Sequence, residues 1–184
     1  GTQAMLTART IIYPNMPKIL SQKFFERKTL EVAENLLGKY LVLGEKAKMI
    51  TEVEAYDGIY DKASHAHKGK TERTKVMFGP PGYWYLYLIY GMYWMLNIVT
   101  DKKEYPAAVL IRGMEGINGP GKLTRDLGID GSFNGKPAVK KTGLWIENRG
   151  VDVSKNNIER TPRIGVDYAG EWAEKPYRFV IESK

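Results

Sequence analysis

The sequence predicts an α+β fold, a single compact domain around a mixed, mainly antiparallel β-sheet with a protruding β-hairpin and peripheral helices. Segments of strand character outnumber those of helix character, and several strands follow one another directly along the chain. The 184 residues are 43% hydrophobic and 27% charged, which suits one domain with a sizeable core. No internal repeat or low-complexity linker divides the chain, so a second domain is not required.

Capping residues predict two helices near the N-terminus. Ser21 precedes a short helix that contains two phenylalanines, and Thr29 is expected to cap a second helix. Apolar residues of the second helix lie on one face, and Gly38 ends it. Residues 1–20 have no such pattern. We expect them to form a partly disordered N-terminal extension, in part a remnant of cloning, and exclude them from fold reasoning.

Strands are predicted where apolar, β-branched and aromatic residues run together or alternate. They are expected at Tyr40–Leu43, Lys48–Glu54, Ala107–Met114, Leu144–Glu147, Arg160–Val166 and Arg178–Ile181. A short helix is expected at Lys122–Leu127, after a glycine-rich turn. From Asp57 to Gly82 the chain is polar, basic and rich in glycine, which indicates a loop.

The most informative segment is YWYLYLIYGMYWMLNIVT, residues 83–100. Its tyrosines alternate with apolar residues at the period of two that is typical of a strand, and Tyr90-Gly91-Met92 supplies a glycine for a reversal. We therefore expect a hairpin. Aromatic side chains at a hairpin tip are costly to leave in water, and one partner for them is a nucleobase, whose stacking contributes about 1–3 kcal/mol per base. A β-rich core that uses tyrosine is the alternative that this run leaves open.

The charge balance narrows the class of partner. The formal charge is +7 and the pI about 9.4, which favours polyanions over acidic small ligands or acidic proteins. Cysteine is absent, which excludes disulfides and thiolate metal sites and suits a reducing compartment. The sequence has no apolar run of membrane-spanning length and no signal-peptide pattern, so we expect an intracellular soluble protein.

Polar residues interrupt the predicted apolar strands. Glu52 and Glu54 are two residues apart and share one face of a strand, where burial would raise their pKa values. A solvated, outward-facing pair is the ordinary expectation for such carboxylates. Asn97 lies between two apolar residues and needs partners if it is buried, and Arg112 ends an apolar run. These residue types in apolar strands indicate one shared polar pocket.

The two histidines, His65 and His67, are separated by one residue in the basic loop. Such a pair invites a metal site, but the absence of cysteine and the mostly cationic neighbours disfavour a divalent ion, and we predict no metal site. A solvated loop and recognition of a base or phosphate both stay open. The cations of the loop form a candidate track for backbone phosphates. They include Lys68, Lys70, Arg73 and Lys75.

Residues 116–123, GINGPGKL, nearly match the phosphate-binding pattern G-x-x-x-x-G-K-[ST]. The match fails because Leu123 stands where a hydroxyl must hold magnesium, and because Pro120 removes one backbone donor. We therefore reject nucleoside triphosphate hydrolysis. The glycine amides and Lys122 at a helix start can still bind a single phosphate.

Six blocks of this sequence, in order and with compatible spacing, resemble the alkyladenine or 3-methyladenine DNA glycosylase family, the methylpurine DNA glycosylases. They are EVEAYDG (52–58), SHAHKGKTERTKVMFGPPG (64–82), YLYLIYGMYWMLNIVT (85–100), AVLIRGMEG (108–116), NGPGKL (118–123) and PRIGVDYAGEWAEKPYRF (162–179). The resemblance runs from about Leu30 to Phe179, and the ordered set is far more specific than any one motif.

The resemblance implies a catalytic pair. Glu54 matches the family's carboxylate that activates a water for attack on the sugar carbon, and Arg112 matches the arginine that helps to hold that water. No lysine stands at the matched catalytic position, which implies a monofunctional enzyme that leaves an abasic site without cleaving the strand. The resemblance implies no cofactor.

The resemblance also implies a base pocket and a wedge. Tyr56 and His65 match residues that line the lesion pocket, and Tyr87 matches the aromatic residue on the opposite face of the extruded base. Asn97 matches the asparagine that disfavours the 2-amino group of guanine. Tyr90 matches the residue that enters the duplex and fills the gap left by the flipped base.

Together these matches imply a base-excision-repair enzyme at residues 21–184. We expect it to be a monomer that binds double-stranded DNA and no membrane, and that acts in the cytoplasm or nucleoid of a prokaryote or in a eukaryotic nucleus. The expected substrates are 3-methyladenine, 7-methylguanine, hypoxanthine and ethenoadenine. A non-catalytic module that binds damaged DNA or RNA is the alternative; it would share the basic charge and aromatic residues but would not require Glu54 or Arg112.

Overall fold

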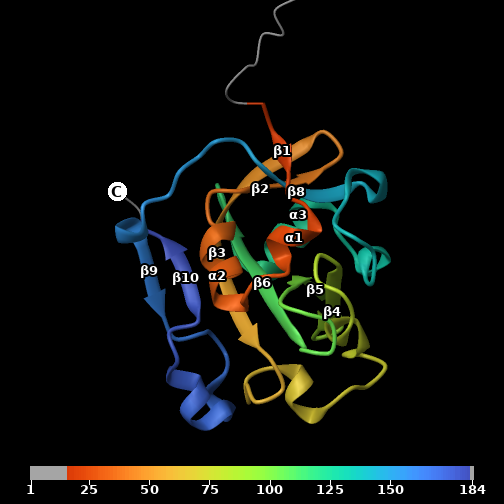
Figure 1. The fold of residues 1–184 in the computed structure, drawn as a ribbon, viewed down its shortest axis with the longest axis vertical. Helices are drawn as coiled ribbons and strands as arrows, with labels where there is room; N and C mark the ends of the chain where they lie inside the picture. The colour runs from red at the N-terminus through yellow and green to blue at the C-terminus, as the bar shows by residue number, and fades with distance from the viewer. Residues whose placement is uncertain (1–15, 183–184) are drawn as a thin grey trace, which may run out of the picture.

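The computed structural model of the chain describes residues 16–182 (Figure 1). Residues 1–15 of the predicted N-terminal extension lie outside the described residues. The strands are β1 (Lys18–Ile19), β2 (Tyr40–Leu43), β3 (Lys46–Asp57), β4 (Trp84–Ile89), β5 (Tyr93–Val99), β6 (Ala107–Met114), β7 (Ile117–Asn118), β8 (Leu144–Asn148), β9 (Ile158–Thr161) and β10 (Arg178–Ile181). The α-helices are α1 (Gln22–Phe25), α2 (Thr29–Leu36) and α3 (Pro120–Leu127). Short 3₁₀ helices are η1 (His65–Lys68), η2 (Lys75–Phe78), η3 (Gly131–Phe133), η4 (Lys140–Thr142), η5 (Lys155–Asn157) and η6 (Asp167–Glu174).

The strands form one curled sheet in the order β1-β8-β2-β3-β6-β5-β4. The long strand β3 is its centre, because it pairs with β2 and β10 as well as with β6. The α+β prediction is confirmed. Every strand pair among residues 16–182 is antiparallel, whereas the sequence analysis allowed for a mixed sheet.

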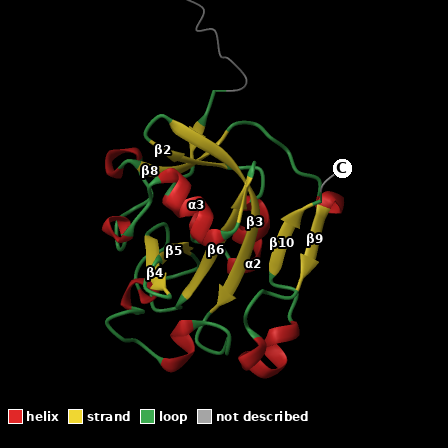
Figure 2. Cartoon of the chain, turned by 180° about the vertical axis from the view of Figure 1, so that it is seen from behind, coloured by secondary structure: helices red, strands yellow, loops and turns green. Residues whose placement is uncertain are grey.

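The helices cover one face of the sheet. In Figure 1, α1 and α2 lie in front of β3 and β6, and Figure 2 shows the same layers from behind. The buried side of α2 packs with alternate residues of the central strands, among them Val53 and Ala55 of β3 and Ile111 of β6. Because side chains alternate along a strand, the residues between these core positions point to the opposite face.

The opposite face lies beneath two loops that are far apart in sequence. Residues 58–82 and 162–177 lie side by side at the lower end of the molecule in Figures 1 and 2. Tyr168 of the second loop donates a hydrogen bond to the carbonyl oxygen of Ala63 in the first. The hairpin β4–β5 stands beside them, so the three segments enclose the face of the sheet that no α-helix covers, called the helix-free face below.

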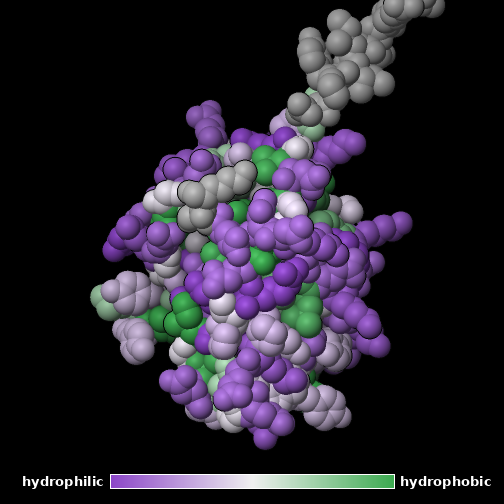
Figure 3. Space-filling view, turned by 90° about the vertical axis from the view of Figure 1, so that its left-hand side faces the viewer, coloured by the Kyte–Doolittle hydropathy of each residue, from purple (hydrophilic) through white to green (hydrophobic). Residues whose placement is uncertain are grey.

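One face of the molecule is mostly polar. On the face shown in Figure 3, hydrophilic residues predominate and apolar residues form only small, scattered patches. Single apolar residues on a surface are normal in soluble domains and do not by themselves mark a binding site.

The predicted bounds of two elements, α2 and β3, were wrong. Lys28, not Thr29, occupies the N-cap position of α2, because the Thr29 hydroxyl is used in a buried hydrogen bond to Thr100 (Oγ1–Oγ1 3.0 Å). Strand β3 exceeds the predicted Lys48–Glu54 at both ends, since β2 and β6 pair with its full length. Gly38 lies just after α2 with φ +85°, as the predicted helix end requires.

Three further boundaries differ. The predicted strand Arg160–Val166 is instead β9, Ile158–Thr161, because Pro162 has no N–H to donate to the sheet and the chain turns into a loop there. Helix α3 starts at Pro120, two residues before the predicted Lys122, since proline suits the first helical turn. Strand β1 pairs with β8, so ordered structure begins before the predicted boundary at residue 20.

Candidate active site

One row of residues crosses four neighbouring strands on the helix-free face. Glu54 of β3 pairs with Leu110 of β6, Leu110 with Asn97 of β5, and Asn97 with Tyr85 of β4. Partners in such a row point to the same side of a sheet. The period of two thus places a carboxylate, an amide and a phenol on one surface, and these residues lie at or beside a single cavity.

The cavity has a volume of about 430 Å³ and is enclosed by the hairpin, the loop with η1 and the loop that follows β9. The predicted site residues Tyr56, His65, Tyr87, Tyr90, Asn97 and Arg112 all line it. Glu54 lies just behind this lining and contacts three of the cavity residues. The structure therefore brings together all seven residues that the resemblance marked for catalysis, base binding or intercalation.

Glu54 is fully buried, which makes the ordinary expectation of a solvated surface pair wrong for this residue. Its Oε1 accepts a hydrogen bond from the Tyr56 hydroxyl at 3.0 Å and lies 3.5 Å from Nη1 of Arg112. Its Oε2 accepts a 2.7 Å bond from the backbone N–H of Ile164. All three partners donate, so the arrangement satisfies an ionised carboxylate rather than a protonated one.

Burial and these partners act on the pKa of Glu54 in opposite directions. Burial is the largest influence and raises the pKa above its ordinary value of 4.5. The charge of Arg112 and the hydrogen bonds from Ile164 and Tyr56 lower it. The result is a carboxylate that loses its proton at higher pH than a solvated glutamate and is a stronger base when ionised.

A local irregularity of the sheet directs Arg112 toward this carboxylate. Val53 pairs with Ile111 and Glu52 with Gly113, so Arg112 is an extra residue between two pairs. Such bulges re-aim side chains and are frequent next to active sites. Arg112 Nε donates to Oε1 of Glu52 at 3.1 Å. Its guanidinium thereby bridges the two glutamates that the sequence placed on one face.

Asn97 is buried and rigidly held. Its Nδ2 donates to the carbonyl oxygens of Tyr85 at 3.2 Å and Met95 at 3.3 Å. Both amide protons are therefore used, which meets the requirement that a buried amide find partners. Because these bonds fix the side chain, its bulk is a permanent part of the cavity wall.

Aromatic rings form the rest of the wall. The rings of His65 and Tyr87 meet edge to face with centroids 4.5 Å apart, and Tyr85 and Tyr87 are 5.6 Å apart. Burial, followed by the charges of Arg73 and Lys68, lowers the pKa of His65 to about 4. His65 is therefore neutral at pH 7 and contributes hydrogen-bonding groups and a ring rather than a charge.

The two histidines do not converge. His67 is exposed, and its Nδ1 lies 2.7 Å from the carbonyl oxygen of Ile59, outside the cavity. Within residues 16–182, no three side chains of histidine, aspartate, glutamate or cysteine are grouped in a way that could hold a metal ion.

Tyr90 is at the tip of the hairpin and is 88% exposed. Tyr90 and Gly91 both have positive φ, 50° and 65°, and Met92 N–H bonds back to the carbonyl oxygen of Ile89, which is the geometry of a type I′ turn. Tyrosine is a strained choice at positive φ. An exposed, strained aromatic residue at a turn serves neither the core nor the turn, which indicates a functional role.

Helix α3 supports the hairpin from the side. Gly121 packs so closely against Tyr93 that a Cβ atom there would lie 2.9 Å from the ring, and the Thr124 hydroxyl donates to the carbonyl oxygen of Trp94 at 2.9 Å. The glycine-rich turn that resembled a phosphate loop thus allows close packing. Lys122 is exposed in the first turn of α3, two residues after Pro120, which lines the cavity.

The cations of the loop lie on the surface. Lys75 pairs with Glu72 at 2.7 Å and Lys70 with Glu104 at 3.8 Å, and exposed pairs of this kind contribute little to stability because solvent screens them. Arg73 places its guanidinium 5.2 Å from the centre of the Tyr87 ring and so packs against the cavity wall. Lys68 is also exposed.

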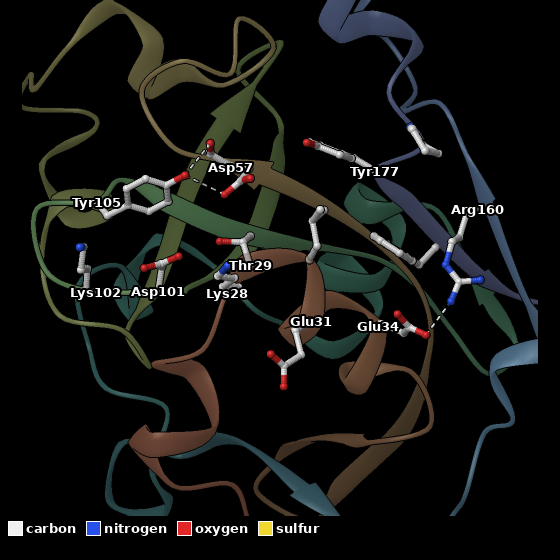
Figure 4. Close-up of a pocket in the computed structure, with 13 residues that line it drawn as sticks. Lys28, Thr29, Glu31, Glu34, Asp57, Asp101, Lys102, Tyr105, Arg160 and Tyr177 are labelled. Carbon is white, nitrogen blue, oxygen red and sulfur yellow. Dashed lines mark hydrogen bonds and ion pairs between the residues drawn. The ribbon is translucent and has the colours of Figure 1, made fainter.

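A second, larger cavity of about 810 Å³ lies on the helix side of β3 (Figure 4). Asp57 follows Tyr56 on β3, points to this cavity, and accepts a hydrogen bond from the Tyr105 hydroxyl at 3.1 Å, drawn as a dashed line in the figure. None of the seven residues that the resemblance marked for catalysis, base binding or intercalation lines it. Its four carboxylates outnumber its three cations, a balance that disfavours a phosphate backbone.

Sequence reasoning missed several residues that build the site. The backbone N–H of Ile164 contacts the catalytic candidate, and Arg178 donates to Glu52 at 2.8 Å. Arg163 and Asp61 form a buried ion pair behind Tyr56. The block at 162–179 was part of the resemblance, but the sequence alone assigned no role to Arg163 or Ile164. Only the fold places Ile164 next to Glu54, which lies 110 residues earlier in the chain.

No helix within residues 16–182 has the length and apolar character needed to cross a membrane.

The chain is similar to proteins of one known family. The family profile described as methylpurine-DNA glycosylase (MPG) matches residues 23–118 and 115–184. A protein of Methanocella arvoryzae named "Putative 3-methyladenine DNA glycosylase" is 48% identical over 185 residues, covering 88% of this chain and 91% of its own. Proteins of the same name from Legionella pneumophila (strain Corby), 47% identical over 89% of this chain and 94% of theirs, and Ehrlichia chaffeensis, 45% identical over 89% and 93%, are also similar. The chain belongs to the methylpurine-DNA glycosylase family.

Proposed function

We propose that this protein is a monofunctional DNA glycosylase that flips alkylated or deaminated purines out of duplex DNA and hydrolyses the N-glycosidic bond with a water activated by Glu54. The observation that carries this proposal is the buried carboxylate of Glu54, held by three donors beside an aromatic cavity that opens under an exposed hairpin tip. The description of the family, methylpurine-DNA glycosylase, and the relatives' name, "Putative 3-methyladenine DNA glycosylase", support damaged purines in DNA as the substrate class.

Glu54 is suited to the role of general base. An ionised carboxylate can take a proton from a water as the water attacks the sugar carbon. The sugar develops positive charge as the bond to the base breaks, and a nearby carboxylate stabilises that charge. Arg112 would hold the water and keep Glu54 ionised, because its guanidinium carries a permanent positive charge.

The cavity and hairpin are suited to base flipping. Extruding a base costs a few kcal/mol of stacking and pairing, which a stacking pocket and an intercalating side chain can offset. The rings of Tyr56, His65 and Tyr87 offer the stacking pocket, and Tyr90 offers the wedge. Positively charged alkylated purines leave readily, whereas neutral bases such as hypoxanthine need protonation on the ring. His65, with its low pKa, is neutral at pH 7 and is a poor source of that proton.

The expected product is an abasic site with an intact strand. A lyase reaction requires an amine that forms a Schiff base, and no lysine is among the cavity-lining residues of the described chain.

The proposal is tested with duplexes that carry one 3-methyladenine, 7-methylguanine, hypoxanthine or ethenoadenine. We expect release of at least one free base, with strand breaks appearing only after alkali treatment. An undamaged duplex is the control. Binding without release of any of the four bases would support a non-catalytic module instead, and breaks before alkali that accompany release would contradict the monofunctional assignment.

Replacing Tyr56 with phenylalanine should move the acidic limb of the pH–rate profile to higher pH. The Tyr56 hydroxyl donates to Glu54 and lowers its pKa, so removing it raises the pKa further. Since Glu54 acts only when ionised, activity would be lost at a higher pH as the pH falls. The measurement is the single-turnover rate of 7-methylguanine release against pH. Tyr168→Phe is the matched control, because that hydroxyl bonds to Ala63 and not to Glu54; an equal displacement in both variants would contradict the prediction.

Replacing Asn97 with serine should relax the rejection of guanine. If the fixed amide occupies the space of a 2-amino group, its removal leaves room for that group, an effect of about 1–3 kcal/mol, or roughly tenfold or more. Excision of guanine and of hypoxanthine from matched duplexes gives the ratio that tests this. An unchanged ratio in a folded Asn97→Ser protein would remove Asn97 from the purine edge.

A further inference from the structure

Arg163 has no exposed side-chain surface and forms a two-pronged ion pair with Asp61, which is also fully buried. Nη1 lies 2.6 Å from Oδ2 of Asp61, and Nη2 lies 2.9 Å from Oδ1. Nη1 also donates to the carbonyl oxygen of Ala55 at 2.9 Å, and Nη2 to that of Trp172 at 3.1 Å. One guanidinium therefore connects the end of β3, the loop after β3, and the η6 helix within the loop that follows β9.

Asp61 completes this connection. Its Oδ2 accepts from the backbone N–H of Asp57 at 2.9 Å, and its Oδ1 from that of Ala63 at 3.0 Å. The carboxylate thus holds the loop that leads to Ser64 and His65 of the cavity wall. The pair spans 102 residues of sequence.

Two groups that contact Glu54 depend on the placement of Arg163. Its guanidinium lies 4.9 Å from the centre of the Tyr56 ring, which packs against it and donates its hydroxyl to Glu54. The next residue, Ile164, supplies the backbone N–H that donates to Oε2 of Glu54. A displacement of Arg163 would therefore move both donors.

Stability alone accounts poorly for this pair. Buried ion pairs are often neutral or unfavourable compared with apolar groups of the same size, because removing two charges from water is costly. Nε of Arg163 is also buried without a partner, which adds to that cost. The arrangement is better explained by what it positions.

We propose that Arg163, through its buried pair with Asp61, is a positioning residue that holds the Ile164 N–H and the Tyr56 ring and hydroxyl on Glu54. This inference rests on the proposed function. Arginine is required because only its planar fork serves two carboxylate oxygens and two carbonyls while stacking on an aromatic ring, whereas lysine is a point charge.

The test is Arg163→Lys, which keeps the positive charge and loses the fork. Its single-turnover rate constant for 7-methylguanine release should fall about 10–100-fold, since misplacing reacting groups by about 1 Å costs up to 10²-fold. The acidic limb of its pH profile should move to higher pH, because the donors that lower the pKa of Glu54 are displaced. Asp61→Asn should likewise lower the rate constant, because it removes the carboxylate that holds the guanidinium of Arg163 in place.

Single-turnover measurement with the enzyme in saturating excess separates positioning from folding, because the rate constant then does not depend on the concentration of folded enzyme. Thermal unfolding reports the folded fraction of each variant. If Arg163→Lys does not fold, Asp61→Asn provides the test in its place. Arg160→Lys is the matched control: Arg160 lies three residues earlier, pairs with Glu34 at 2.6 Å and lines the other cavity. Its rate constant and pH profile should stay as in the wild type.

The outcomes are distinct. Variants with a lower melting temperature but a wild-type rate constant and pH limb would show that the pair only stabilises the fold, and would overturn the proposal. Equal defects in Arg160→Lys would overturn it as well. If the wild-type protein itself releases no base, the proposed function is overturned and this inference with it.

Discussion

Glu54→Gln should lower the single-turnover rate of base release by about 10²–10⁴-fold, the usual contribution of a general base. Binding to a lesion-containing duplex should stay within about tenfold, roughly 1.4 kcal/mol. The change is nearly isosteric and removes the group that accepts the proton of the water. The cavity wall that would contact the base, including Asn97 and Tyr87, is unaltered.

The hydrogen bonds of Glu54 define what the variant loses. Glutamine keeps one acceptor oxygen, so one set of donors stays satisfied while its amide faces another donor, Tyr56, Arg112 or Ile164. A mismatch of this kind costs about 1–3 kcal/mol when buried. We therefore expect a lower melting temperature and a folded protein, which circular dichroism checks before the kinetics are compared.

Glu52→Gln is the matched control. Glu52 lies on the same strand and face and shares Arg112 with Glu54, but its side chain is 14% exposed rather than fully buried, and it also pairs with Arg178. We expect a smaller fall in rate, since Arg112 loses part of its support while the base survives. If Glu54→Gln retains turnover, or if both variants lose activity equally, Glu54 is not the base.

Tyr90→Ala should weaken lesion-duplex binding and slow excision, each by an amount comparable to one lost stacking contact, about 1–3 kcal/mol. The ring is exposed at the hairpin tip and would fill the space that a flipped base leaves. The loss should be smaller for lesions in bulges or unpaired sites, where less stacking has to be broken. Tyr90→Phe retains the ring and is expected to behave like the wild type.

Fluorescence of 2-aminopurine beside the lesion reports unstacking, and binding at several salt concentrations separates a wedge from a phosphate contact. Lysine-to-alanine changes at Lys68, Lys70 and Lys75 should weaken lesion and undamaged duplexes equally and make the salt dependence shallower, by about 0.9 in log–log slope per lost phosphate contact. Normal unstacking by Tyr90→Ala, or a purely salt-dependent defect, would move the wedge role to Met92 or Tyr93 at the same turn.

Local patterns predicted most of the sheet. The strands at Tyr40–Leu43, Ala107–Met114 and Arg178–Ile181 have the predicted bounds. A run of apolar residues predicts a buried strand from its own side chains, without knowledge of the rest of the fold. The errors lie where one residue has two possible uses. Thr29 fits a helix cap but bonds to Thr100, and the residues after Pro162 alternate like a strand but have no strand to pair with.

The candidate site also has features that local patterns predict and features that they do not. Alternation along each strand determines that Glu54 and Tyr56 share a face, that Tyr85 and Tyr87 do, and that these faces differ from those of their apolar neighbours. The ordered blocks of sequence identified the family and marked seven residues, of which six line one cavity and the seventh, Glu54, lies directly behind that lining. These properties depend only on the order of residues within short segments, so the sequence alone predicts them.

The tertiary structure alone decided which faces meet. The order β3-β6-β5-β4 aligns Glu54, Leu110, Asn97 and Tyr85 in one row, and the bulge at Arg112 turns its guanidinium toward Glu54. The burial of Glu54, the donor from Ile164 and the Arg163–Asp61 pair come from segments about 100 residues apart. No local pattern specifies such contacts, because they arise only when the whole sheet closes and water is excluded from the space between its loops.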